Sequence, residues 1–220
     1  MEVIMETDRV VVDRIGRLGV LPVVELPSED AALPLAEALC AGSLDAAEVT
    51  LRTPAALEAI RAMRTHHPNM LVGAGTVRSL EDAKRAADAG AQFLVSPGTN
   101  FQVVSYAQEA GIPMVPGACT PTEIDAAVRA GAETVKFFPA EAIGGVRLIN
   151  ALAGPFADVL LVPTGGIRAT NLAEYLSLPN VLACGGTWIA TRELLEEGRF
   201  DRIRVLAREA FQIACETRNG

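Results

Sequence analysis

The sequence predicts a (β/α)8 TIM barrel, built as one domain over residues 1–220 with an extra N-terminal helix over residues 1–19. Short apolar runs alternate with Ala-rich helical patterns, and this unit recurs eight times without a change in composition. Alternating strands and helices imply parallel strands joined by right-handed crossovers. Eight such units favour a closed barrel. An open doubly wound sheet is the alternative, although no predicted strand is followed by its GxGxxG fingerprint.

Each predicted strand is a short apolar run. The eight are Val20–Leu26, Ala47–Arg52, Leu71–Val77, Gln92–Pro97, Pro113–Gly117, Thr134–Pro139, Val159–Thr164 and Val181–Gly185. Glycine supplies the left-handed residue that ends a helix. The glycines that close helical patterns are Gly42, Gly90, Gly111 and Gly131. Apolar residues also recur at helical spacing before the first strand, and they predict the extra helix that packs on the barrel. They are Val10, Val11, Ile15 and Leu18.

Composition and charge limit the classes of function. Half of the residues are hydrophobic and the formal net charge is −8, so the chain has a globular composition without the basic balance that nucleic acids or membrane surfaces favour. Residues 1–12 lack the apolar core of a signal peptide, and no apolar run approaches the ~20 residues of a membrane span. The four cysteines are scattered and form no CxxC pair. We therefore expect reduced thiols, no metal site and a cytoplasmic location.

Polar and apolar residues alternate in the second predicted strand. Successive side chains of a strand point to opposite faces, so Glu48, Thr50 and Arg52 share one face. Both faces of an all-parallel sheet are covered, and a buried carboxylate or guanidinium is costly unless it is paired or used. A structural ion pair is one explanation. We favour the hypothesis that these residues line an inward-facing site.

The sixth predicted strand places a lysine among apolar residues. Lys136 points the same way as Thr134 and Phe138, whereas Lys84, the other lysine, lies in a polar helical segment where we expect it to be solvated. Removing an ammonium group from water favours its neutral form, and a neutral amine is what attacks a carbonyl carbon. The alternative is a lysine that reaches the strand end or neutralises Glu48. Because Glu48 faces the same cavity, the nucleophile is the favoured hypothesis.

Glycine pairs follow the last two predicted strands. Thr164-Gly165-Gly166 ends the seventh strand and Gly185-Gly186-Thr187 ends the eighth. Loops after strands seven and eight are where barrels commonly hold a phosphate, because glycine lets backbone amides approach the oxygens and a hydroxyl adds a donor. One glycine pair alone would be ordinary turn chemistry. Thr76, at the end of the third strand, either adds a hydroxyl to the same mouth or caps a helix.

Five stretches resemble the 2-keto-3-deoxy-6-phosphogluconate (KDPG) aldolase family, whose relatives also act on 4-hydroxy-2-oxoglutarate (KHG). They are Val49-Thr50-Leu51-Arg52-Thr53, Gly73-Ala74-Gly75-Thr76, Lys136-Phe137-Phe138-Pro139-Ala140-Glu141, Pro163-Thr164-Gly165-Gly166 and Gly185-Gly186-Thr187-Trp188. The resemblance runs from about the first strand to the last helix, and the KFFPAE stretch is its most specific part. It implies a homotrimeric class I aldolase of (β/α)8 fold that needs no metal or organic cofactor.

The resemblance also implies roles for individual residues. Lys136 would form the Schiff base and Glu48 would act as the general acid and base. Arg52 and Thr76 would hold the carboxylate of the pyruvyl part, and the two glycine loops would hold the phosphate. The other implied substrate-binding residues are Pro97, Phe138, Thr164, Gly165, Gly166, Gly185, Gly186 and Thr187.

Two positions depart from the family pattern. Thr187 stands where serine is usual, and Ile143 lies in a loop that is usually small or polar there. Neither touches the implied chemistry, so a phosphorylated keto acid is the expected substrate. Three alternatives stay open: an aldolase for the galactonate epimer, an isomerase of another phosphate-binding barrel family without a Schiff base, and a regulatory barrel without activity. The sequence also leaves open the preferred C4 epimer and the direction of the reaction in the cell.

Overall fold

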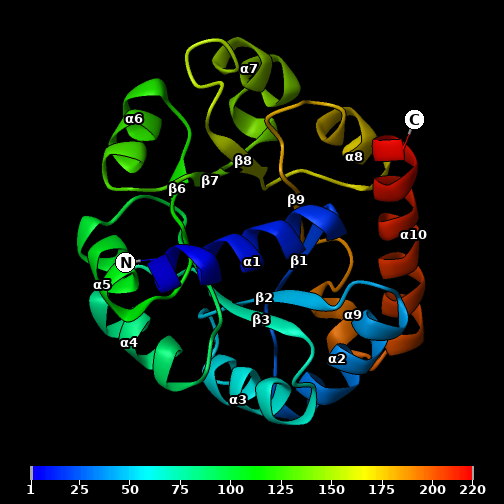
Figure 1. The fold of residues 1–220 in the computed structure, drawn as a ribbon. Helices are drawn as coiled ribbons and strands as arrows, with labels where there is room; N and C mark the ends of the chain where they lie inside the picture. The colour runs from blue at the N-terminus through cyan, green and yellow to red at the C-terminus, as the bar shows by residue number, and fades with distance from the viewer. Residues whose placement is uncertain (1, 220) are drawn as a thin grey trace.

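The computed structural model describes the backbone of residues 2–219 and the side chains of residues 9–219. Its centre is a ring of parallel strands with helices around the outside (Figure 1). The strands are β1 (Val20–Val24), β2 (Ala46–Thr50), β3 (Leu71–Gly75), β4 (Leu94–Val95), β5 (Met114–Val115), β6 (Gly117–Ala118), β7 (Thr134–Phe137), β8 (Leu160–Pro163) and β9 (Cys184–Gly186). The predicted (β/α)8 barrel is confirmed.

The strand order shows how the ring closes. One sheet has the order β5-β4-β3-β2-β1-β9 and the other has the order β6-β7-β8, with every pair parallel. Two bridges, Leu161 with Val181 and Thr164 with Gly185, join β8 to the segment of β9. The fifth predicted strand appears as the short strands β5 and β6 on either side of Pro116, which has no N–H to donate to a ladder.

Ten α-helices of the described chain surround the ring or cover its ends. They are α1 (Glu2–Leu18), α2 (Ala32–Ala41), α3 (Ala56–His66), α4 (Leu80–Asp88), α5 (Phe101–Ala110), α6 (Pro121–Arg129), α7 (Gly145–Leu152), α8 (Ala169–Leu176), α9 (Arg192–Glu196) and α10 (Phe200–Asn219). Short 3-10 turns occur at η1 (Glu29–Ala31) and η2 (Glu141–Ile143). Ser79 and Thr120 begin α4 and α6 with capping boxes. Within residues 2–219, no helix combines the length and apolarity of a membrane span.

The predicted N-terminal helix is α1, which crosses the amino-terminal end of the barrel (Figure 1). Its residues Val11, Ile15 and Leu18 are buried, whereas Val10 is 60% exposed. Including Val10 in the packed face was therefore wrong: Val10 and Val11 are adjacent, and successive helical residues point about 100° apart. The side chains of the first eight residues lie outside the described part.

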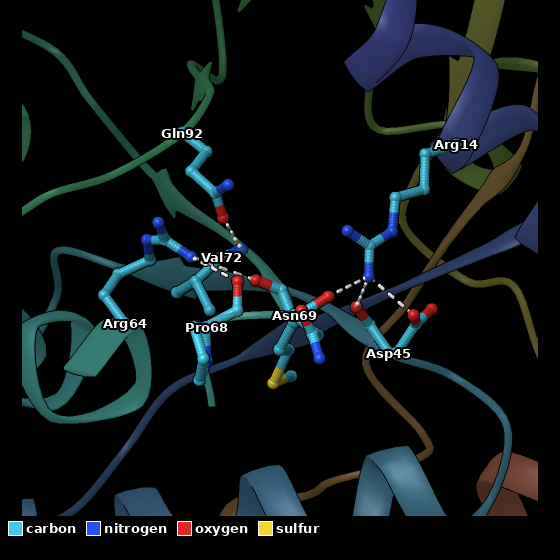
Figure 2. A network of polar contacts seen from close by, with 8 residues as sticks. Arg14, Asp45, Arg64, Pro68, Asn69, Val72 and Gln92 are labelled. Atoms are coloured by element: carbon cyan, nitrogen blue, oxygen red, sulfur yellow. Dashed lines mark hydrogen bonds and ion pairs between the residues drawn. The ribbon is translucent and has the colours of Figure 1, made fainter. Parts of the chain in front are cut away.

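Arg14 fastens α1 to the loops that precede β2 and β3 (Figure 2). Its Nη2 donates to the backbone oxygen of Asp45 at 3.2 Å, to Oδ2 of Asp45 at 2.5 Å and to the backbone oxygen of Asn69. Arg64 donates to the nearby carbonyl groups of Pro68 and Met70, both at 3.3 Å. These contacts hold α1 across the amino-terminal end of the barrel. The carboxyl ends of the strands lie at the opposite, open end.

Three of the four predicted helix-ending glycines adopt a positive φ, at Gly90, Gly111 and Gly131. Gly42 does not, because its φ is −89° and the left-handed residue is Ser43 with a φ of 68°. Gly42 has a different function in the fold. A Cβ atom there would lie 2.5 Å from Cβ of Ala207 and 2.8 Å from the backbone oxygen of Arg204. Glycine is therefore needed where α2 packs closely against α10.

Candidate active site

A buried ion pair lies inside the barrel, between β7 and β2. Nζ of Lys136 donates to Oε1 of Glu48 at 3.0 Å, and the two side chains are only 8% and 2% exposed. The sequence predicts that both face one cavity, and the structure places them in direct contact. Each charge is compensated by the other, which reduces the free-energy cost of burying both. The pair brings a primary amine and a carboxylate within proton-transfer distance.

The space for the Glu48 carboxylate is made by a glycine on the neighbouring strand. A Cβ atom at Gly75 would lie 2.6 Å from Cγ and 2.8 Å from Cδ of Glu48. Any side chain at this position of β3 would therefore displace the carboxylate. Thr50, on the same strand as Glu48, donates its hydroxyl to the backbone oxygen of Val24 at 3.0 Å. Its polar atom thus contacts β1, and no charged partner is involved.

Arg52 lies outside β2, although the sequence predicts it as the last residue of the second strand. β2 ends at Thr50, and the backbone N–H of Arg52 donates to the oxygen of Thr50 at 2.8 Å within a turn. The side chain is half exposed, and its Nε donates to Oγ1 of Thr76 at 3.2 Å. Thr76 follows β3 with a φ of 58° and does not cap α4, whose N-cap is Ser79. The turn brings the Arg52 guanidinium to the open end of the barrel, beside Thr76.

A carboxylate that is not among the predicted site residues lies beside this guanidinium. Glu25 directly follows β1, and its Oε2 is 3.7 Å from Nη1 of Arg52. Its Oε1 is 3.5 Å from Nη1 of Arg192, the first residue of α9. Glu25 therefore bridges two arginines at the mouth. The available indication was its position immediately after the first predicted strand, where barrel side chains reach the mouth.

The two predicted glycine segments lie side by side at the same end, but only the first is a loop, because Gly185 and Gly186 are buried residues of strand β9. Thr164 and Gly185 form a β-bridge, and a Cβ atom at Gly185 would lie 2.9 Å from Cγ2 of Thr164. Gly165 and Gly166 have φ values of 100° and 84°, a region that favours glycine. Thr187 is exposed directly after β9. The loop Gly165–Gly166 can therefore present backbone N–H groups to an anion, and Thr187 can add a hydroxyl.

Phe138 and Pro97 are also among the residues predicted to bind substrate. The Phe138 ring centroid is 5.7 Å from Nζ of Lys136, and a Cβ atom at Gly165 would lie 3.5 Å from the ring. Phe138 therefore lies between the amine and the first glycine loop. Pro97 follows β4, and its backbone occupies the space that a side chain at Gly117 would require. Both residues are partly buried.

Cysteine and metal-ligand chemistry have little support among the described residues. Burial raises the pKa of the Cys184 thiol, and a hydrogen bond to Glu123 raises the pKa of Cys119, so both thiols hold their protons more firmly than usual. All four cysteines are free. Among the described side chains, those of residues 9–219, no group of three or more His, Cys, Asp or Glu is placed to hold a metal ion.

The fold and the buried pair together define a class of protein. It is a (β/α)8 barrel whose interior holds an amine in contact with a carboxylate, with Arg52, Thr76 and a glycine loop at the carboxyl ends of the strands. The family model "KDPG and KHG aldolase" matches residues 11–206. The chain belongs to this family, and it is therefore an aldolase, a carbon–carbon lyase.

Individual relatives agree with the family model. A 2-dehydro-3-deoxy-phosphogluconate aldolase of Treponema pallidum is 46% identical, over 91% of this chain and 96% of its own. The KHG/KDPG aldolase of Escherichia coli is 45% identical, over 88% of this chain and 91% of its own. A solved structure of KDPG aldolase from Legionella pneumophila, with pyruvate captured as a covalent carbinolamine, is 38% identical. It has a TM-score of 0.88 and covers 91% of this chain and 97% of its own.

Proposed function

We propose that this class I aldolase cleaves KDPG to pyruvate and glyceraldehyde 3-phosphate, with Lys136 as the Schiff-base residue. The observation that carries the proposal is the buried contact of 3.0 Å between Nζ of Lys136 and Oε1 of Glu48. The contact supplies both groups that Schiff-base chemistry requires, an amine and a carboxylate within proton-transfer distance, and the ring of Phe138 lies 5.7 Å from the amine. Cleavage of KHG to pyruvate and glyoxylate is a second activity of the same site.

The reaction begins with attack of the Lys136 amine on the C2 keto carbon. Glu48 transfers protons to and from the carbinolamine, which loses water to give a protonated imine. The C4 hydroxyl then gives its proton to Glu48, directly or through a water molecule, and the C3–C4 bond breaks. Its electron pair forms the enamine and neutralises the iminium nitrogen. Protonation at C3 and hydrolysis by water release pyruvate and regenerate the amine.

The substrate is held at both ends in this proposal. Arg52 offers a bidentate pair of N–H groups to the carboxylate, and Thr76 adds a hydroxyl. Their hydrogen bond of 3.2 Å supports a joint role. The phosphate is bound by the loop Gly165–Gly166, by the end of β9 at Gly185–Gly186 and by Thr187. Pro97, Phe138 and Thr164 form the wall between these anchors.

We also propose that the protein is a homotrimer that acts in the cytoplasm, in the Entner–Doudoroff pathway. The support is the family to which the chain belongs. Analytical ultracentrifugation tests the assembly: a species of three times the chain mass of 23.1 kDa is expected. A monomer at micromolar concentration would contradict this part of the proposal alone.

Pyruvate formation tests the proposed substrate. KDPG, its C4 epimer and KHG are each supplied, and lactate dehydrogenase reports the pyruvate released. We expect the highest kcat/KM for KDPG. A higher kcat/KM for the galactonate epimer would assign the other sugar acid to this site. Release of no pyruvate from any of the three would contradict the proposed aldolase reaction.

A further inference from the structure

A buried tyrosine hydroxyl lies behind the first glycine loop. Tyr175 of α8 is fully buried, and its hydroxyl donates to Oε1 of Glu141. Burial and the neighbouring Glu141 carboxylate both raise the pKa of Tyr175, so the hydroxyl keeps its proton and acts as a donor. Among the described residues, Glu141 is its only hydrogen-bond partner. Removal of the acceptor would leave a buried polar group unsatisfied.

Glu141 is attached to the glycine loop through its backbone. It begins the turn η2, and its N–H donates to the oxygen of Gly165 at 3.1 Å. The preceding N–H, of Ala140, donates to the oxygen of Thr164 at 2.8 Å. The segment that leaves β7 after Lys136 is therefore bonded, residue by residue, to the loop that leaves β8.

The Glu141 side chain also fixes the path of the loop. A Cβ atom at Gly166 would lie 2.5 Å from both Cβ and Cγ of Glu141, so the Glu141 stem fills the side-chain space of that glycine. On the other side, a Cβ atom at Gly145 would lie 2.9 Å from Oε1 of Glu141 and 2.9 Å from the Tyr175 hydroxyl. The pair is thus enclosed between the loop and the start of α7.

These contacts have a consequence for anion binding. The N–H groups of Gly165 and Gly166 can converge on an anion only while the backbone keeps its positive φ values of 100° and 84°. The Glu141 stem packs directly against this backbone, and Tyr175 holds the end of the Glu141 side chain. Without the hydrogen bond, the Glu141 side chain loses its anchor and the loop keeps only the backbone bonds from Ala140 and Glu141.

We propose that Glu141 and Tyr175 are positioning residues that hold the Gly165–Gly166 loop in the shape that binds the terminal phosphate of the substrate. The inference rests on the proposed function, in which this loop is part of the phosphate site. Neither residue touches the reacting carbons. Their effect is therefore on the binding of phosphorylated substrates, while the chemistry at Lys136 is unchanged.

Three variants and one control test this inference. Tyr175→Phe removes the donor, Glu141→Ala removes the acceptor and the stem, and Glu141→Gln keeps a stem of equal length with an acceptor oxygen. The control is Tyr106→Phe, at a partly buried tyrosine of α5. KM and kcat are measured with KDPG and with KHG, which has no phosphate. Thermal unfolding shows that each variant is folded.

We expect Tyr175→Phe and Glu141→Ala to raise KM for KDPG about tenfold, the effect of weakening hydrogen bonds to a charged group. Their kcat for KDPG and their KM for KHG should stay within about twofold of wild type, a range too small to indicate lost transition-state binding. Glu141→Gln and Tyr106→Phe should behave as wild type. An equal rise in KM for both substrates, or a Glu141→Gln variant as impaired as Glu141→Ala, would overturn the inference.

Binding of inorganic phosphate, measured by titration calorimetry, gives a readout that needs no turnover. Wild type should bind phosphate about tenfold more tightly than Tyr175→Phe, by the same hydrogen-bond argument. If wild type binds phosphate in this way but does not cleave KDPG, the proposed function fails and the positioning role stands. If KDPG is cleaved and both proteins bind phosphate equally, or wild type binds none, the positioning role fails and the proposed function stands.

Discussion

Replacing Gly75 with alanine tests the geometry of the buried pair without changing either charged residue. The added Cβ would lie 2.6 Å from Cγ and 2.8 Å from Cδ of Glu48, whereas carbon atoms in contact are separated by about 3.5–4.0 Å. The Glu48 side chain must therefore move by about 1 Å. Its carboxylate is 2% exposed and lies 3.0 Å from Nζ of Lys136, so a shift of that size misaligns or breaks their hydrogen bond.

The expected result is a large loss of turnover in a folded protein. A misplacement of 1 Å in a catalytic group can lower the rate about 10²-fold, so we expect kcat of Gly75→Ala to fall by roughly that factor. Overpacking should also lower the free energy of unfolding by about 1–3 kcal/mol. The assay is pyruvate release, together with thermal unfolding to show that the variant is folded.

The matched control is Gly154→Ala, because a Cβ atom at Gly154 would have no atom within 4 Å and the position lies beyond α7. It should retain the kcat and the stability of wild type. If Gly75→Ala also retained wild-type kcat, the carboxylate of Glu48 would not need its observed position. The buried contact between Glu48 and Lys136 would then not be required for catalysis.

Further substitutions address the amine, the carboxylate and the phosphate loop. Lys136→Arg should abolish nearly all turnover, since a guanidinium is too basic to act as an amine nucleophile, whereas Lys84→Arg should leave kcat unchanged. Glu48→Gln should lower kcat by roughly 10²–10⁴-fold through loss of the acid–base group, while imine formation is slowed but detectable. If this variant kept the wild-type kcat, Glu48 would be only an ion-pair partner of Lys136. Thr187→Val should lower kcat/KM for KDPG by about tenfold and barely affect KHG, and equal losses on both substrates would argue against a phosphate contact.

The alternation of strands and helices could be predicted from the sequence because each element has its own periodicity and its own end. Eight apolar runs separated by helical patterns favour a barrel over an open sheet. The two-residue repeat of a strand places Glu48 and Lys136 on the polar faces of their strands. Strand ends were less predictable. The polar residues Glu48, Thr50 and Arg52 alternate with apolar ones, so the sequence predicts a strand that continues to Arg52. The chain nevertheless enters a turn after Thr50. The alternation cannot reveal this turn, because a polar residue occupies the expected position in either case.

Contacts between distant segments could not be predicted in this way. Glu25 and Arg192 are far apart in the chain and meet because β1 and β9 are neighbours in the closed ring. Gly42 has the sequence context of a helix end, although its absent side chain makes room for α10. Tyr175 reaches Glu141 only after α8 has packed against the barrel. Each of these contacts depends on the closed ring, which no local pattern describes.

Borohydride trapping tests most directly whether Lys136 forms a covalent imine with the keto group of the substrate. Incubating the protein with pyruvate and sodium borohydride reduces any imine to a stable secondary amine, and peptide mapping by mass spectrometry locates it. The chain has only one other lysine, Lys84, which serves as an internal control. We predict a single adduct per chain, on the peptide that contains Lys136. An adduct on Lys84, or no adduct under conditions in which KDPG is cleaved, would contradict imine formation by Lys136.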